Sequence, residues 1–191
     1  MACTVLDARP VAVTGSLDGT VRVWDLATGR PVGEPLTGHA GQVGAVACTV
    51  LDGRPVAVTG SDDKTVRVWD LATGRPVGEP LTGHIDRVRA VACTVLDGRP
   101  VAVTGSDDKT VRVWDLATVG WPAGQRLTGH TGAVWAVACT VLDARPVAVT
   151  GSDDKTVRVW DLATGRPVGE PLTGHIDRVR AVACTVLDGR P

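Results

Sequence analysis

The sequence predicts an all-β fold built from a short unit that is repeated along the chain. One segment of 45 residues occurs twice without a change, at Val56–Pro100 and at Val147–Pro191. Two dipeptides, Trp-Asp and Gly-His, also recur every 45 or 46 residues, with their aromatic members at Trp24, Trp69, Trp114, Trp160, His39, His84, His130 and His175. Self-similarity at this period with these two marks is typical of the blades of a β-propeller, each a sheet of four strands.

The third copy shows how one unit divides into strands. We expect strands at Val88–Thr94, Pro100–Gly105 and Thr110–Leu116 because these runs are rich in β-branched residues and are bounded by turn residues. Pro100 stands first in its strand, where it removes no ladder hydrogen bond. The run Ser106–Lys109 predicts a tight turn. In the second copy, Arg75–Leu81 predicts a short outer strand whose prolines discourage pairing with other chains.

The recurring Gly-His, Ser-x-Asp-x-Thr and Trp-Asp elements resemble those of the WD-repeat β-propeller family, over essentially the whole chain. In that family a His, a Thr or Ser, an Asp and a Trp of one blade form a hydrogen-bonded tetrad. The resemblance implies three such tetrads in continuous segments: His39, Thr59, Asp63 and Trp69; His84, Thr104, Asp108 and Trp114; His130, Thr150, Asp154 and Trp160. Buried imidazole, hydroxyl, carboxylate and indole groups can satisfy one another in this way.

A fourth tetrad predicts a blade assembled from both ends of the chain. Thr14, Asp18 and Trp24 have no preceding His, and the matching residue is His175. We therefore expect residues 1–35 to supply the last three strands of a split blade. Residues 36–80, 81–126 and 127–171 should form complete blades, and residues 172–191 should supply the closing first strand, Val179–Thr185. Ala2–Pro10 resembles Ala183–Pro191, so the two compete for one position, and the longer C-terminal copy is expected to win.

The blade count raises the question of what the ring encloses. Each blade must fill roughly 90° in a ring of four but only about 45° in a ring of eight, the limits of the usual range. The chain has 6 Trp and no Phe or Tyr, so few side chains are bulky enough for a wide wedge. We expect two chains to form an eight-bladed ring as a homodimer with mutual strand donation. A closed four-bladed monomer is the alternative.

Composition excludes several classes of function. A net charge of −1 disfavours nucleic-acid binding and electrostatic attachment to a membrane, and the apolar runs are too short to span one. No signal-peptide pattern follows Met1, which predicts a cytoplasmic protein. The five cysteines all stand at the same position of the repeat. They are expected to be small core residues and not to form disulfides or bind a metal. No cofactor or metal site is expected.

The repeats differ most just after Gly-His, on one rim of the predicted ring. The exposed candidates for binding a protein or peptide there are Arg87, Arg89, Trp135, Arg178 and Arg180, because Arg and Trp are common interaction hot spots. Drift at exposed positions would give the same pattern. Trp121, in a loop one residue longer than its counterparts, is either an exposed anchor or a loop plug.

Three functions are consistent with these features. A non-enzymatic protein-interaction scaffold is the function that the family resemblance implies. An excised or engineered block of a longer array, with self-assembly as its only activity, is favoured by the 45-residue duplication. Similar arrays also stand behind signalling NTPase or kinase domains, where the chain would be a sensor. Repeated His and Asp residues suit a scaffold better than an enzyme, because identical constellations in every blade are not one active site.

Overall fold

Every regular element in the described part of the chain is a β-strand. The computed structural model describes residues 1–117 and 125–185, and its strands form four antiparallel sheets, here called blades 1 to 4 in chain order. Blade 1 contains β1 (Ala2–Leu6), β2 (Arg9–Gly15) and β3 (Val21–Asp25); blade 2 contains β4 (Val43–Leu51), β5 (Arg54–Ser61), β6 (Val66–Asp70) and β7 (Arg75–Pro76); blade 3 contains β8 (Val88–Leu96), β9 (Arg99–Ser106), β10 (Val111–Asp115) and β11 (Gln125–Leu127); blade 4 contains β12 (Val134–Leu142), β13 (Arg145–Ser152) and β14 (Val157–Asp161). The all-β repeat prediction is confirmed.

The outer position of blades 1, 2 and 4 is less regular than a continuous strand. In blade 2 the expected strand Arg75–Leu81 is reduced to β7 and an isolated bridge between Val66 and Leu81. Two prolines, Pro76 and Pro80, lie in this stretch and cannot donate backbone hydrogen bonds. Blades 1 and 4 have only isolated bridges there.

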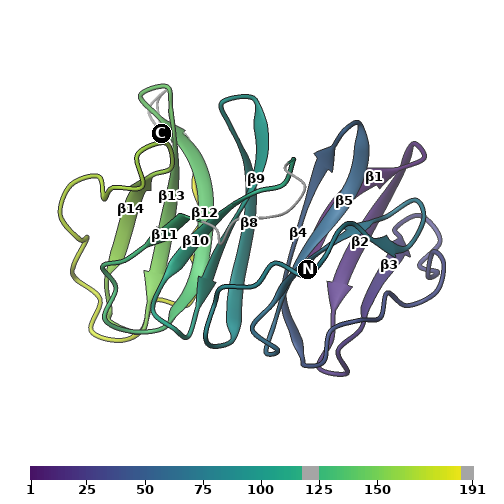
Figure 1. Ribbon diagram of the computed structural model, residues 1–191, viewed down its shortest axis with the longest axis horizontal. Helices are drawn as coiled ribbons and strands as arrows, with labels where there is room; N and C mark the ends of the chain where they lie inside the picture. Colours follow the sequence, from purple (N-terminus) through teal and green to yellow (C-terminus); the bar gives the residue numbers. More distant parts are fainter. Residues whose placement is uncertain (118–124, 186–191) are drawn as a thin grey trace.

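The blades stand side by side in an arc, with β1–β3 at one end and β12–β14 at the other (Figure 1). The first strands of successive blades, β1, β4, β8 and β12, are spatial neighbours in that order. The blade interfaces are therefore built from the two faces of each sheet, which explains why the middle strands are almost continuously apolar.

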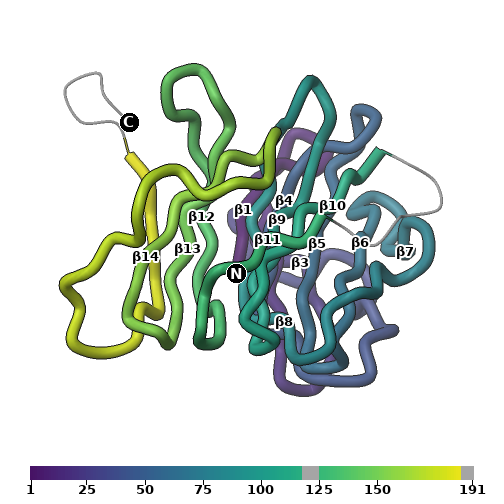
Figure 2. Tube along the Cα trace, turned by 60° about the vertical axis from the view of Figure 1, so that its left-hand side comes forward, coloured from purple at the N-terminus to yellow at the C-terminus, as the bar shows by residue number. Residues whose placement is uncertain are grey.

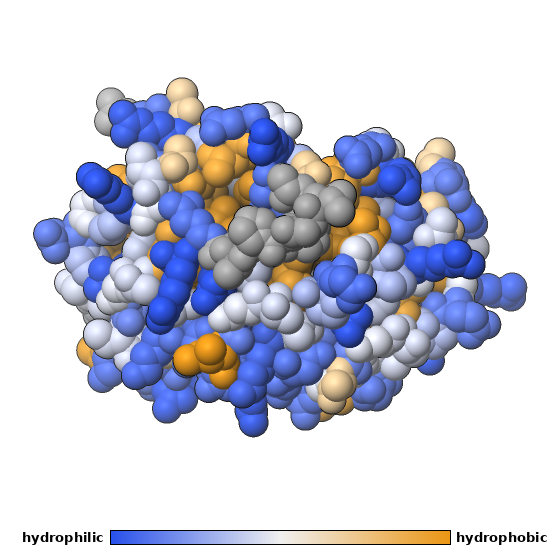
Figure 3. Space-filling view, viewed as in Figure 1, coloured by the Kyte–Doolittle hydropathy of each residue, from blue (hydrophilic) through white to orange (hydrophobic). Residues whose placement is uncertain are grey.

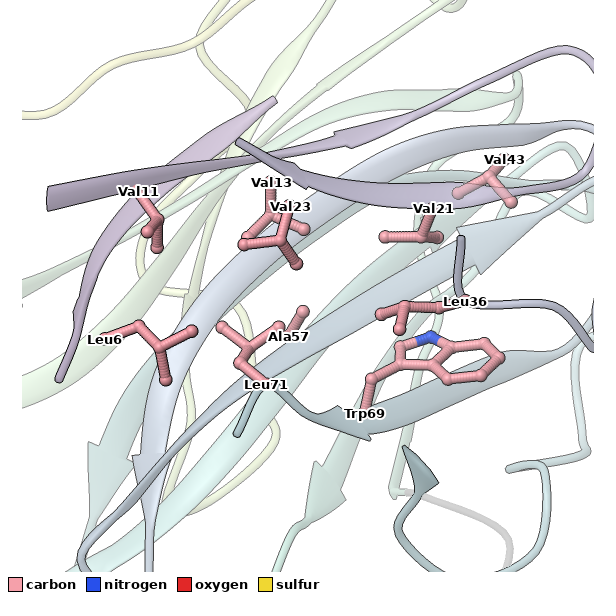
Figure 4. Packing of buried hydrophobic residues seen from close by; sticks show 10 residues of the cluster. All are labelled: Leu6, Val11, Val13, Val21, Val23, Leu36, Val43, Ala57, Trp69 and Leu71. Atoms are coloured by element: carbon pink, nitrogen blue, oxygen red, sulfur yellow. The ribbon is translucent and has the colours of Figure 1, made fainter. Parts of the chain in front are cut away.

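Each interface between blades has the same kind of core. Between blades 1 and 2, Val11, Val13 and Leu36 face Trp69 and Leu71 (Figure 4). Equivalent clusters join blades 2 and 3 and blades 3 and 4. Neighbouring blades approach closely at a glycine in the second strand of each blade. A Cβ built on Gly60, for example, would lie 2.6 Å from a methyl group of Val88 in the next blade. Glycine is required there because any side chain would collide with the next blade.

The two ends of the arc hold the N-terminal strand and the C-terminal segment. Strand β1 pairs with β2, with Cys3 opposite Ala12, so it holds the innermost position of blade 1. The prediction that Val179–Thr185 fills this position is not met within the single chain. That segment instead follows the free side of blade 4 (Figure 2). Arg180 contacts Trp135 of β12, and Val179 donates its backbone N–H to the carbonyl of Ser152 in β13 at 2.9 Å.

The face viewed in Figure 1 is hydrophilic over most of its periphery, and apolar groups gather towards its centre (Figure 3). The described ranges contain no helix of the length and hydropathy needed to cross a membrane. Trp121, whose role the sequence left open, lies outside the described residues.

Candidate functional site

A polar network links two loops and two strands within blade 3. His84, in the loop before β8, is buried between Asp108 and Thr104. Its Nδ1–H donates to Asp108 Oδ2 at 2.8 Å, since a carboxylate only accepts, and its Nε2 accepts from Thr104 Oγ1 at 2.8 Å. The Thr104 oxygen in turn accepts from Trp114 Nε1–H at 2.9 Å. The side-chain polar groups of His84, Thr104, Asp108 and Trp114 thus all have partners within this network.

The same arrangement occurs in blades 2 and 4, around His39 and His130. The imidazole–carboxylate, imidazole–hydroxyl and indole–hydroxyl distances repeat at 2.8, 2.8 and 2.9 Å in both blades. Sequence reasoning missed a further member of each network. Thr65, Thr110 and Thr156 each donate a hydroxyl hydrogen bond to the network Asp of their own blade, at 2.6 to 2.7 Å. The signal for it was present, because each Asp is followed two residues later by Thr.

Burial and hydrogen bonding favour a neutral imidazole at His39 and His130 and an ionised carboxylate at Asp63. Burial lowers the pKa of His39, and the neighbouring Asp63 only partly offsets this effect. Burial alone would raise the pKa of Asp63, but hydrogen bonds from Thr65 and His39 outweigh it and hold the pKa at about 2. His130 also has a lowered pKa, with burial as the main cause. A neutral imidazole that is saturated with hydrogen bonds suits a structural role.

The fourth set is incomplete in the single chain. Trp24 Nε1–H donates to Thr14 Oγ1 at 2.9 Å, as in the other blades. Across the described residues, no hydrogen bond joins His175 to Thr14, Asp18 or Trp24, and His175 is exposed. The predicted fourth tetrad is therefore not assembled within one copy.

The rim residues form a line of charge pairs across the blade junctions. At the junction of blades 2 and 3, Arg89 contacts Asp62 at 3.2 Å and Asp107 at 2.8 Å, and Arg87 lies 3.8 Å from Asp62. Arg178 and Arg180 lie 3.7 and 3.9 Å from Asp153. The arginines Arg87 and Arg178 have about half of their side chains exposed (53% and 56%), whereas Arg89 is only 19% exposed. Sequence reasoning missed the aspartates, which belong to the repeated Ser-Asp-Asp-Lys turn.

Trp135, a predicted rim-binding residue, is not free in the structure. The guanidinium carbon of Arg180 lies 3.9 Å from the centre of its ring, and that of Arg89 lies 4.7 Å away. Its indole N–H is buried without a hydrogen-bond partner, so stacking holds the ring. Trp135 therefore bridges two arginines and does not offer a free aromatic face to a ligand.

The cysteines are free thiols in the structure. Cys3 is exposed rather than buried as expected, because nothing covers the end of the arc, and the others are partly buried. Burial raises the pKa of Cys48 to about 11 and that of Cys93 to about 12, so both stay protonated and unreactive at neutral pH. Within residues 1–117 and 125–185, no group of three or more His, Cys, Asp or Glu side chains is arranged to hold a metal ion.

Comparison with protein-family models shows the family to which the chain belongs. The model of the WD domain, G-beta repeat, matches residues 2–25, 29–70, 74–115 and 122–161. The chain belongs to the WD40 family. Each complete WD40 match begins after the third strand of one blade and ends with the third strand of the next, so the repeat in the sequence is offset from the blade in space. A search of curated proteins finds no match. WD40 repeats generally serve in protein–protein interactions, and the polar networks described above are buried scaffold elements of this fold.

Proposed function

We propose that the chain is a non-enzymatic protein-interaction scaffold, in which two copies complete one eight-bladed WD40 ring and its Gly-His rim binds a partner protein. The observation that carries this proposal is that the two ends of the arc expose side chains that every internal blade buries. The His–Asp pairs belong to repeated, saturated networks, which leaves them no role in catalysis.

The exposure of equivalent leucines supports completion of the ring. Leu26 of blade 1 is 52% exposed, whereas Leu71, which occupies the same repeat position, is 5% exposed. At the other end of the arc, Leu172 is 56% exposed and its equivalent Leu81 is 2% exposed. Burying an apolar side chain of this size contributes about 1.5–3 kcal/mol, so both ends gain from contact with another blade.

The free side of blade 4 forms an apolar groove of about 350 Å³ between Leu142, Val149 and Leu172 of the blade and Cys184 of the C-terminal segment. Between blades 1 and 2 the equivalent space is filled by Ala57, Trp69 and Leu71. A second copy would present Ala12, Trp24 and Leu26 to this groove, which are the same residue types at the same repeat positions. The two exposed faces are therefore complementary in size and chemistry.

The pairing needed between copies already occurs once inside the chain. Arg9–Ser16 has the same sequence as β9 (Arg99–Ser106), and Val179–Thr185 has the same sequence as Val88–Thr94 of β8. Strands β8 and β9 pair in register, with Cys93 opposite Ala102. By the same register Cys184 of one copy would lie opposite Ala12 of the other, and His175 would complete the tetrad of Thr14, Asp18 and Trp24.

Strand β1 must leave its position for this exchange. It supplies five residues, from Ala2 to Leu6, and leaves Thr14 and Gly15 without a neighbour on that side. The segment beginning at Val179 would pair with these residues as well and would also supply the missing imidazole. Because the longer segment would pair with more backbone groups and supply the imidazole, exchange is favoured over retention of β1.

The solution mass tests the ring. We expect a species of about twice the 19.8 kDa chain mass in light scattering. A monomer that does not change with concentration would overturn the eight-bladed ring and leave a closed four-bladed monomer as the alternative.

The partner is expected on the rim that carries Arg87 and Arg178, next to Ile85, which is 76% exposed. Arg87→Glu should abolish capture of a reproducible partner from a host lysate. Arg54→Glu is the matched control, because Arg54 is 64% exposed and lies at the other end of the strands. Equal loss in both variants, or a partner unaffected by Arg87→Glu, would contradict a rim site.

A second function is favoured by the exact 45-residue duplication, namely a block of a longer array that only self-assembles or serves as the sensor of a signalling protein. A dimer that captures no partner would favour this second function.

A further inference from the structure

The C-terminal segment is held against blade 4 by contacts of two kinds. The first kind recurs at internal blade junctions. Val179 N–H donates to Ser152 O at 2.9 Å, just as Val43 N–H donates to Ser16 O at 2.9 Å. A Cβ on Gly151 would lie 2.6 Å from a methyl of Val179, as at Gly60 and Val88.

The second kind of contact is a cation–π contact to Trp135 on the rim of blade 4. The guanidinium of Arg180 stacks on Trp135 at 3.9 Å. The residues equivalent to Trp135 in blades 2 and 3 are Gly44, which has no side chain, and Arg89, which has no aromatic ring. Blade 4 is thus the one described blade whose rim carries an aromatic ring, and it is the blade on which the C-terminal segment rests.

An aromatic residue suits this point because two arginines contact it. The guanidinium carbon of Arg89 also lies over the indole ring, 4.7 Å from its centre. An arginine at position 135 would place three guanidinium groups in a row, and like charges would repel. A π face attracts both cations, and such contacts are favourable even where they are partly exposed.

We propose that Trp135 is a positioning residue for ring closure: it holds Arg180, and with it Val179–Thr185, against blade 4 in the place that the second copy must find. This inference rests on the proposed dimer for its purpose, but the contact itself lies within one chain. It also removes Trp135 from the rim residues available to a partner protein.

Trypsin provides the test, because Arg178 and Arg180 precede bonds that it cuts. Intact-mass spectrometry would follow loss of residues 179–191 or 181–191 from dilute, monomeric protein. When opening is fast, the cleavage rate follows the population of the released segment. We expect Trp135→Leu to raise this rate roughly threefold to tenfold, the loss appropriate to a cation–π contact. Trp135→Tyr, which keeps an aromatic face, should restore most of the protection.

Two further measurements make the result specific. Trp135→Gly should release the segment without lowering the melting temperature of the blades, because Gly44 is accommodated at the same position of blade 2. The Leu variant should also weaken the dimer by a similar factor in sedimentation. Equal cleavage rates for the Trp, Tyr and Leu proteins would overturn the positioning role. A wild-type chain that never dimerises would instead contradict the proposed ring and leave the cleavage result to decide the role of Trp135.

Discussion

At the scale of single residues, each buried histidine joins a carboxylate and a hydroxyl group by hydrogen bonds. His84→Ala should lower the free energy of unfolding by about 1–3 kcal/mol, because Asp108 and Thr104 lose a partner while they remain buried. His175→Ala is the matched control in the monomer, where His175 is exposed and should contribute nothing. Chemical denaturation of both variants at low protein concentration measures the difference, and equal stability would remove the structural role.

The same networks predict that acid destabilises the fold in two steps. Burial lowers the pKa of His39 and His130 below the ordinary value of 6.5, so the unfolded chain takes up protons first as the pH falls. The pKa of Asp63 is held at about 2, below its ordinary 3.8. A second loss of stability therefore begins as the pH falls through 3.8 and continues towards 2. The melting temperature should be level above about pH 7 and fall below about pH 6. A rise on acidification would contradict neutral, buried imidazoles.

The network residues show what sequence can and cannot predict at this scale. The recurrence of His, Thr, Asp and Trp identified the members that meet in blades 2, 3 and 4, because those segments are continuous. The place of Trp135 could not be predicted, since its two arginines come from neighbouring segments whose side chains converge only in space. The exposure of Cys3 likewise follows from the open arc and not from its repeat position.

At the scale of elements, the two termini should have opposite effects on assembly. Removing residues 176–191 should leave a monomer, because it deletes the exchanged strand. Removing residues 1–6 should leave the dimer intact or tighten it, because β1 occupies the position that the partner segment needs. Light scattering of the two truncated chains checks this, and a monomer after the N-terminal deletion would show that β1 is not displaced.

Equivalent leucines in blades 1 and 2 distinguish the proposed interface between copies from the core of one copy. Leu26→Asp should dissociate the dimer while the monomer stays folded, since Leu26 is 52% exposed in the single chain. Leu71→Asp should unfold the blade itself, because an unpaired carboxylate would be buried where Leu71 is 5% exposed. Sedimentation and circular dichroism distinguish these outcomes. A folded dimer of the Leu26 variant would exclude this face from the interface.

At the scale of the whole molecule, the repeat period and its two dipeptides predicted the strands and blades, but not which first strand lies in blade 1. Ala2–Leu6 and the segment at Ala183 share their sequence, so local pattern cannot decide between them. Within one chain the nearer strand, β1, takes the position, because the tight turn at Asp7 and Ala8 places it beside β2. In the proposed ring the competing choice is made by a second copy, which local sequence does not encode.

A single cysteine substitution tests the exchange of strands most directly. Ala12 lies opposite Cys3 in the single chain and would lie opposite Cys184 of a second copy after exchange. Opposed residues of antiparallel strands have Cα atoms roughly 4.5–5.5 Å apart, which a disulfide can span. The account predicts that oxidised Ala12→Cys protein is a covalent dimer, with peptide mapping that joins position 12 of one copy to Cys184 of the other. A disulfide between position 12 and Cys3, or to Cys184 of the same chain, would contradict it.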